Sequence, residues 1–120
     1  MQAASFGRIV TVSSISGYGV GVNGCHYAAS KGGLQGLMRN LATRLAKDGI
    51  SVNDVAPAMI EGTGMIPNSA AIPGVLETVP VGRLGSVEEV GAAVGMFVGN
   101  GMSRGRAWWL LGGCRICEVE

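Results

Sequence analysis

The chain has 120 residues, enough for one domain of modest size and too few for two. Hydrophobic residues make up 48% of the sequence and charged residues 14%, so a buried core is expected and disorder is not. The net charge of +1 gives no electrostatic reason to expect a nucleic-acid partner. No apolar run approaches the roughly 18 residues of a membrane span, and "MQAASFGRIV" lacks the layout of a signal peptide. We therefore expect a cytoplasmic protein without a membrane partner.

The cysteines favour a reducing environment. Cys25, Cys114 and Cys117 are too few for a disulfide framework. Cys114 and Cys117 have the CxxC spacing, but a redox or metal site would need a helix start or two further ligands, and the chain contains one histidine. We predict no metal site.

The first half of the chain reads as strand, loop, helix and strand. Residues 8–14 are rich in β-branched residues and nearly all apolar for five positions, which is typical of a strand buried on both faces. Glycines and Asn23 make 15–25 a loop. Over 27–46 the leucines recur at spacings of three and four, and Met38 and Ala42 widen the stripe, which predicts an amphipathic helix that Asp48 and Gly49 end. Residues 50–58 form a second apolar strand, closed by proline.

The second half continues this alternation. Residues 58–79 are long and poorly periodic, which favours a mobile lid or binding loop. Ser86 and Glu89 have capping-box spacing at the start of a helix over 86–99. A third strand follows at 107–111. Alternating strands and helices predict an α/β protein with a parallel sheet, of about three strands and two main helices.

A tyrosine and a lysine stand one helical turn apart. Tyr27 and Lys31 are four residues apart in "YAASK", so both side chains should lie on the same side of the helix. A neighbouring ammonium favours the phenolate, and a phenol adjusted in this way can exchange a proton with a carbonyl or alcohol oxygen. Ser14 ends the first strand, where a parallel sheet binds its ligands. Such a pair also occurs by chance on solvated helices, and Ser14 could simply finish a strand.

The order of these features resembles the short-chain dehydrogenases/reductases, particularly the members similar to 3-oxoacyl-carrier-protein reductases. The stretches that carry the resemblance are "GRIVTVSSISG", "YAASKGGLQGL", "LAKDGISVNDVAPAMI", "PVGRLGSVEEV" and "GNGMSRGRAWWLLGG". They extend from Gly7 to Gly113. The resemblance implies a Rossmann-like doubly wound fold and an NAD(P)-dependent oxidoreductase that interconverts a small carbonyl compound and a secondary alcohol by hydride transfer.

The resemblance also implies roles for particular residues. Ser14 would orient the substrate oxygen, Tyr27 would be the general acid/base, and Lys31 would support the tyrosine and bond the nicotinamide ribose. The segment against the nicotinamide of NAD or NADP would comprise Pro57, Ala58, Ile60 and, with a register uncertain by one residue, Thr63.

The resemblance covers the C-terminal half of such an enzyme. No G-x-x-x-G-x-G segment follows a strand, so we expect residues 1–120 to form one partial Rossmann-like domain without the N-terminal dinucleotide-binding half. Two hypotheses follow. The chain is the catalytic half of an oxidoreductase, or it is a truncated, inactive relative that acts as an oligomerisation or binding module or is a gene-model fragment.

Members of the family pair through the helix that carries the tyrosine and lysine, so the resemblance implies a homo-oligomer. Leu34, Gly36, Leu37 and Leu41 are candidates for that interface or for the core of the chain. Because an amphipathic helix usually buries its apolar stripe within its own domain, we expect most of the stripe to be core.

Overall fold

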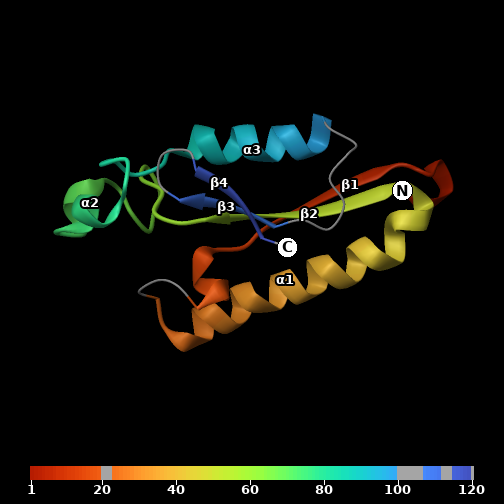
Figure 1. Ribbon diagram of the computed structural model, residues 1–120, viewed down its shortest axis with the longest axis horizontal. Coiled ribbons are helices and arrows are strands. Elements are labelled where there is room, and N and C mark those ends of the chain that lie inside the picture. Colours follow the sequence, from red (N-terminus) through yellow and green to blue (C-terminus); the bar gives the residue numbers. More distant parts are fainter. Residues whose placement is uncertain (20–22, 100–106, 112–114, 120) are drawn as a thin grey trace.

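A computed structural model of the chain describes residues 1–19, 23–99, 107–111 and 115–119, the last two ranges as backbone. The described residues form a four-stranded sheet in the order β1-β2-β3-β4. Its parallel strands are β1 (Gly7–Val12), β2 (Ile50–Pro57) and β3 (Ala107–Leu111), and β4 (Arg115–Val119) runs antiparallel to β3. Helix α1 (Cys25–Leu45) covers one face and α3 (Val87–Gly99) the other (Figure 1). The predicted partial Rossmann-like α/β fold is confirmed.

Strand β2 is the central buried element. Every residue from Ile50 to Ala56 is buried, because β1 and β3 flank the strand and a helix packs on each face. The prediction of a second apolar strand is therefore confirmed, and the structure adds that the strand is buried. Strand β1 differs from its prediction: within the described sheet it has a neighbour on one side, most of its residues are half-buried, and Val12 is 44% exposed. A run of β-branched residues does not distinguish an edge strand from a central one.

Helix α1 buries part of the predicted apolar stripe, since Leu41 and Leu45 pack against the core under the helix and Leu37 does not. The core under it contains Met38 and Ala42, whereas Leu37 is 49% exposed. The close approach of Gly17 to α1 accounts for this rotation. A Cβ placed on Gly17 would lie 2.8 Å from the backbone nitrogen of Gly32, so the 3-10 turn η2 (Ile15–Tyr18) packs directly on the helix backbone. That contact turns the line Gly32, Gln35, Met38 and Ala42 inward.

The turn from α1 into β2 follows the prediction. A 3-10 turn, η3 (Ala46–Asp48), closes the helix, and Gly49 adopts a left-handed φ of 69°. A Cβ on Gly49 would lie 2.3 Å from the carbonyl oxygen of Ser5. The backbone conformation and the lack of space therefore both require glycine at this position.

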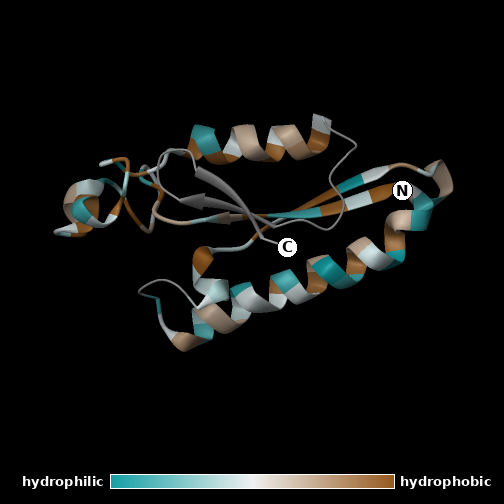
Figure 2. Ribbon diagram, in the orientation of Figure 1, coloured by the Kyte–Doolittle hydropathy of each residue, from teal (hydrophilic) through white to brown (hydrophobic). Residues whose placement is uncertain are grey.

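Helix α3 and the segment before it build the rest of the core. Phe97 and Ala93 pack on Val55 of β2, and Figure 2 shows hydrophobic residues of α3 mainly on its sheet side. Residues 58–79, predicted as a mobile lid or binding loop, contain the 3-10 turn η4 (Ser69–Ala71) and the short helix α2 (Val75–Thr78). Val75 and Val79 of this segment form a small hydrophobic cluster with Leu84.

The sequence predicts no helix or strand beyond residue 111. Strand β4 was not predicted, because "CRICEVE" contains a charged residue at every second or third position and carries little apolar signal. Gly113 and Cys114, to which the resemblance and the CxxC spacing drew attention, lie outside the described residues. In the part of the chain that the structure describes, no helix is long and apolar enough to cross a membrane.

Replacing Phe97 by alanine tests the packing of α3 on the sheet. The ring is 1% exposed, so Phe97→Ala should lower the free energy of unfolding by about 3–5 kcal/mol. The neighbouring Val98 is 54% exposed, and Val98→Ala should cost less than about 0.5 kcal/mol. Urea denaturation followed by circular dichroism measures both. Equal costs for the two variants would contradict the described orientation of α3.

Candidate active site

A cavity of about 560 Å³ opens where β1 and β2 end. Because the two strands are parallel, their carboxyl ends meet at the same edge of the sheet, which is where open α/β sheets bind ligands. The cavity is also bordered by the first turns of α1 and α3. All the site residues predicted from the sequence line it: Ser14, Tyr27, Lys31, Pro57, Ala58, Ile60 and Thr63.

Ser14 lies just beyond β1, with 7% of its surface exposed. Its Oγ accepts a hydrogen bond of 3.2 Å from the N–H of Ser16 and thereby caps the turn η2. The amide of Asn23 donates to the Ser16 hydroxyl at 3.3 Å, which ties the following loop to the same turn. The Ser14 hydroxyl is thus held in place through an accepted bond, and its proton can still be donated into the cavity.

Tyr27 and Lys31 occupy the first two turns of α1. The ammonium nitrogen of Lys31 lies 5.7 Å from the centroid of the Tyr27 ring. It donates a hydrogen bond of 3.1 Å to the carbonyl oxygen of Val12, the last residue of β1. An ammonium has three N–H donors, so this bond positions the lysine and leaves it further donors for a ligand. A cation, a phenol and a hydroxyl therefore border one cavity, which is an arrangement suited to binding and protonating an oxygen atom.

The segment after β2 forms the opposite, mainly apolar side. It is tied to the start of α3 by two backbone bonds of 2.9 Å, from Glu61 to Gly85 and from Gly85 to Met59. The Thr63 hydroxyl donates to the carbonyl of Ile60 at 3.3 Å and accepts from the N–H of Ile66 at 3.1 Å. Thr63 therefore lines the cavity while its hydroxyl serves the loop itself.

Sequence reasoning missed part of the lining. Val87 and Val90 were assigned only to the apolar stripe of α3, and the resemblance did not single out the residues that complete the apolar wall. The spacing of valines in a helix predicts burial but not what they are buried against. The apolar wall also contains Met59, Met65, Ile66 and Ile72.

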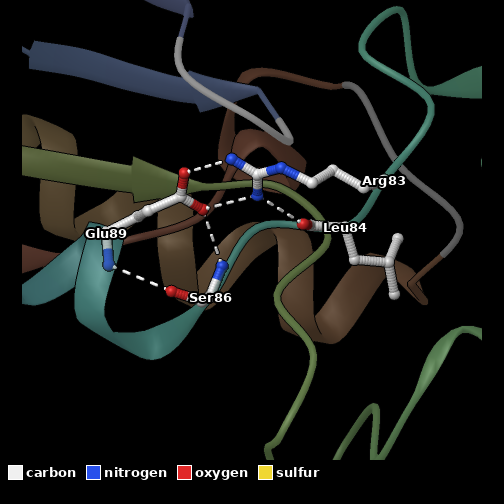
Figure 3. Close-up of polar contacts among 4 residues, drawn as sticks. All are labelled: Arg83, Leu84, Ser86 and Glu89. Carbon is white, nitrogen blue, oxygen red and sulfur yellow. Dashed lines mark hydrogen bonds and ion pairs between the residues drawn. The ribbon is translucent and has the colours of Figure 1, made fainter.

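A capping box fixes the start of α3 beside the cavity (Figure 3). The Ser86 N–H donates to Glu89 at 2.8 Å, and the Glu89 N–H donates back to Ser86 Oγ at 3.3 Å, as the spacing predicted. Arg83 adds two hydrogen bonds to the same carboxylate, at 2.7 and 3.0 Å, and donates to the carbonyl of Leu84. The Arg83 guanidinium and then the Ser86 amide lower the pKa of Glu89 to about 2.

A buried carboxyl lies directly behind the cavity wall. Asp54, in the middle of β2, is fully buried, and its carboxylate accepts hydrogen bonds from the hydroxyls of Thr11 and Ser13. Burial raises its pKa, while the two hydroxyls and the positive charge of Lys31 act in the opposite direction. Sequence reasoning did not single it out, although a charged residue inside an apolar strand was a usable signal. Among the described residues, no group of three or more His, Cys, Asp or Glu could hold a metal ion.

Comparisons with known proteins agree with this geometry. The profile of the family described as enoyl-(acyl carrier protein) reductase matches residues 1–104. The 3-oxoacyl-acyl-carrier-protein reductase of Aggregatibacter actinomycetemcomitans is 43% identical over 78% of this chain and 38% of its own length. The acetoacetyl-CoA reductase of Rhizobium meliloti is 40% identical over 78% of this chain and 40% of its own.

The chain therefore belongs to the short-chain dehydrogenase/reductase family, an oxidoreductase family. A third relative, the 3-oxoacyl-acyl-carrier-protein reductase MabA of Mycobacterium avium, is 41% identical over 78% of this chain and 37% of its own length. The chain thus spans about two fifths of the length of the curated relatives that it matches.

The pH dependence of stability tests the capping box. Because folding lowers the pKa of Glu89 from 4.5 to about 2, its ionised form stabilises the fold above pH 4.5, and this contribution is lost as the pH falls towards 2. Glu89→Gln should remove that part of the acid sensitivity. Arg83→Ala should remove some of it, because the bond from Ser86 remains. Urea unfolding between pH 6 and 3 measures the effect, and identical pH profiles for wild type and Glu89→Gln would refute it.

Proposed function

We propose that the chain provides the catalytic half of an NAD(P)-dependent oxidoreductase that interconverts a carbonyl compound and a secondary alcohol. The observation that carries the proposal is the single cavity that brings together Ser14, Tyr27 and Lys31 from β1 and α1. The family of oxidoreductases to which the chain belongs supports the reaction class. The chain spans about two fifths of the length of its relatives. The reaction is therefore proposed for a protein that contains this half, and not for these residues acting alone.

Each polar residue has a part in handling the reacting oxygen. The Tyr27 hydroxyl gives its proton to the oxygen in reduction and takes it back in oxidation. The Lys31 ammonium lies 5.7 Å from the centroid of the Tyr27 ring, so a positive charge borders the same cavity as the reacting oxygen. The hydroxyl of Ser14, held by its bond from Ser16, donates to the same oxygen and orients the carbonyl.

The cavity fits the nicotinamide and ribose end of NAD or NADP. Pro57, Ala58 and Ile60 offer an apolar wall to a flat ring, and Lys31 has N–H donors left for ribose hydroxyls. When bound, the nicotinamide supplies or accepts the hydride. Thr63 fits less well as a partner of the carboxamide, because its hydroxyl already donates to the carbonyl of Ile60. The protein's own residues bind, orient and exchange the proton.

The apolar wall indicates the class of substrate. Met59, Met65, Ile66 and Ile72 line the same cavity as the polar residues, so the space favours an apolar chain over a charged one. The names of the relatives, which refer to 3-oxoacyl carriers and acetoacetyl-CoA, agree with this expectation. We propose a small carbonyl substrate with an apolar substituent.

Titration of the purified chain with NADPH and NADH, followed by nicotinamide fluorescence, is the first experiment. Saturable binding in the micromolar range would support a usable cofactor site in this chain. No binding up to millimolar concentrations would favour the second hypothesis, in which the chain is a truncated relative that binds or oligomerises without turnover.

Tyr27→Phe tests the proton donor. Loss of the hydroxyl should lower turnover by at least about 100-fold, the usual scale of general acid catalysis, while cofactor binding changes little. The matched control is Tyr18→Phe, because Tyr18 packs against the core under α1 and does not line the cavity. Where the chain alone does not turn over, the same pair of variants is placed in a full-length context. Retained turnover in Tyr27→Phe would contradict the assignment.

The exposed face of α1 supports a homo-oligomer. Leu37 is 49% exposed, and its neighbours Gly33 and Gly36 on this face leave open space that a second helix could enter. We propose that this face pairs with the same face of another copy. Such an arrangement would cover an apolar side chain that the fold of one chain leaves in water.

Leu37→Lys tests that pairing. The added charge should shift the chain from dimer or larger species towards monomer in sedimentation velocity, because a buried unpaired ammonium opposes association. Val98→Lys, on the outer side of α3, is the control and should leave the distribution unchanged. A wild-type chain that is monomeric at all concentrations would overturn the proposal.

A further inference from the structure

The carboxyl of Asp54 is an unusual feature of the core. It is 0% exposed and stands in a strand whose other residues from Ile50 to Ala56 are apolar, small or neutral. A carboxyl in such a place is costly unless its oxygens are hydrogen-bonded. Both oxygens have partners: Thr11 donates to Oδ1 at 2.5 Å and Ser13 donates to Oδ2.

The partners of Asp54 lie on the strand that leads into the site. Thr11 stands opposite Asp54 in the parallel register of β1 and β2. Ser13 lies one step beyond β1, lines the cavity, and is fixed to β2 a second time because its N–H donates to the carbonyl of Val55 at 2.9 Å. Ser13 lies between Val12, whose carbonyl accepts the hydrogen bond from Lys31, and Ser14, whose hydroxyl borders the cavity.

The groups that surround the Asp54 carboxyl come from the end of β1 and from α1. Burial raises the pKa of the Asp54 carboxyl, while the hydroxyls of Ser13 and Thr11 and, last, the positive charge of Lys31 act in the opposite direction. Helix α3 packs on the opposite side of the sheet, against Val55. The hydroxyls of Thr11 and Ser13 lie within hydrogen-bond distance of the two carboxyl oxygens, and both can donate to the ionised form. Protonation would force one of these two bonds to reverse or break.

We propose that Asp54 is a positioning residue, which holds the end of β1 through Ser13 and thereby keeps the Val12 carbonyl in place as the acceptor of the Lys31 ammonium. One consequence of the proposal rests on the function proposed above: Lys31 and Ser14 take part in catalysis only if that function is right. The positioning itself is a property of the folded chain. It can therefore be measured without turnover.

The accessibility of Lys31 gives a readout of this positioning. The chain contains two lysines, and Lys47 in the exposed turn after α1 serves as an internal reference. Competitive acetylation at low reagent concentration, with mass spectrometry of the two modified peptides, gives the Lys31/Lys47 rate ratio. Asp54→Asn replaces one carboxyl oxygen by an amide nitrogen, which cannot accept a hydrogen bond. This variant should raise the ratio by about threefold to tenfold, the range expected for loss of one ordinary hydrogen bond.

Two further variants separate positioning from general destabilisation. Ser13→Ala removes the bridge to the cavity but leaves Asp54 in place, and it should raise the ratio in the same direction. Val52→Ala removes apolar volume two residues away on the same face of β2, where Val52 is fully buried. It should lower the free energy of unfolding and leave the ratio unchanged. If Asp54→Asn does not fold, Ser13→Ala decides.

The outcomes are distinct from those of the cofactor titration. A raised ratio in Asp54→Asn or Ser13→Ala with an unchanged ratio in Val52→Ala supports the proposal, even if the chain binds no nicotinamide. An unchanged ratio in the folded Asp54 and Ser13 variants, confirmed by circular dichroism, overturns it. An equal rise in Val52→Ala also overturns it, because the effect would then follow from lost stability.

Discussion

The parallel register between β1 and β2 is the constraint on which the site depends. It aligns Gly7 with Ile50 and Val12 with Val55, so that both strands end at the same edge of the sheet. It also sets Thr11 opposite Asp54. A shift of one residue would exchange the faces of β1, sending the Thr11 and Ser13 hydroxyls to the apolar cluster under α3. The register is therefore fixed by polar pairing on one face as well as by apolar packing on the other.

Much of the fold and the site could be predicted because they depend on local patterns. The change from strand to helix periodicity located β2, α1 and α3 within a few residues. The capping box at Ser86 and Glu89 formed as expected, because its geometry is set within four residues of chain. The predicted site residues lie around one cavity, since the order of strand ends in a parallel sheet determines which loops meet.

What could not be predicted depends on contacts between distant segments. The rotation of α1, which leaves Leu37 exposed, follows from the approach of Gly17 to Gly32, and no periodicity within the helix contains that information. The half-buried state of β1 follows from its place at the edge of the described sheet. The apolar wall of the cavity follows from the way residues 58–79 fold back on Leu84.

The walls of the cavity come from segments spread between Val12 and Val90, and this has a consequence for how the chain responds to ligands. No local portion of the fold can build the cavity without the sheet and both long helices in place. A molecule that binds this cavity and not the unfolded chain therefore stabilises the whole described fold. Above its Kd, the added free energy of unfolding grows with the logarithm of the concentration of that molecule.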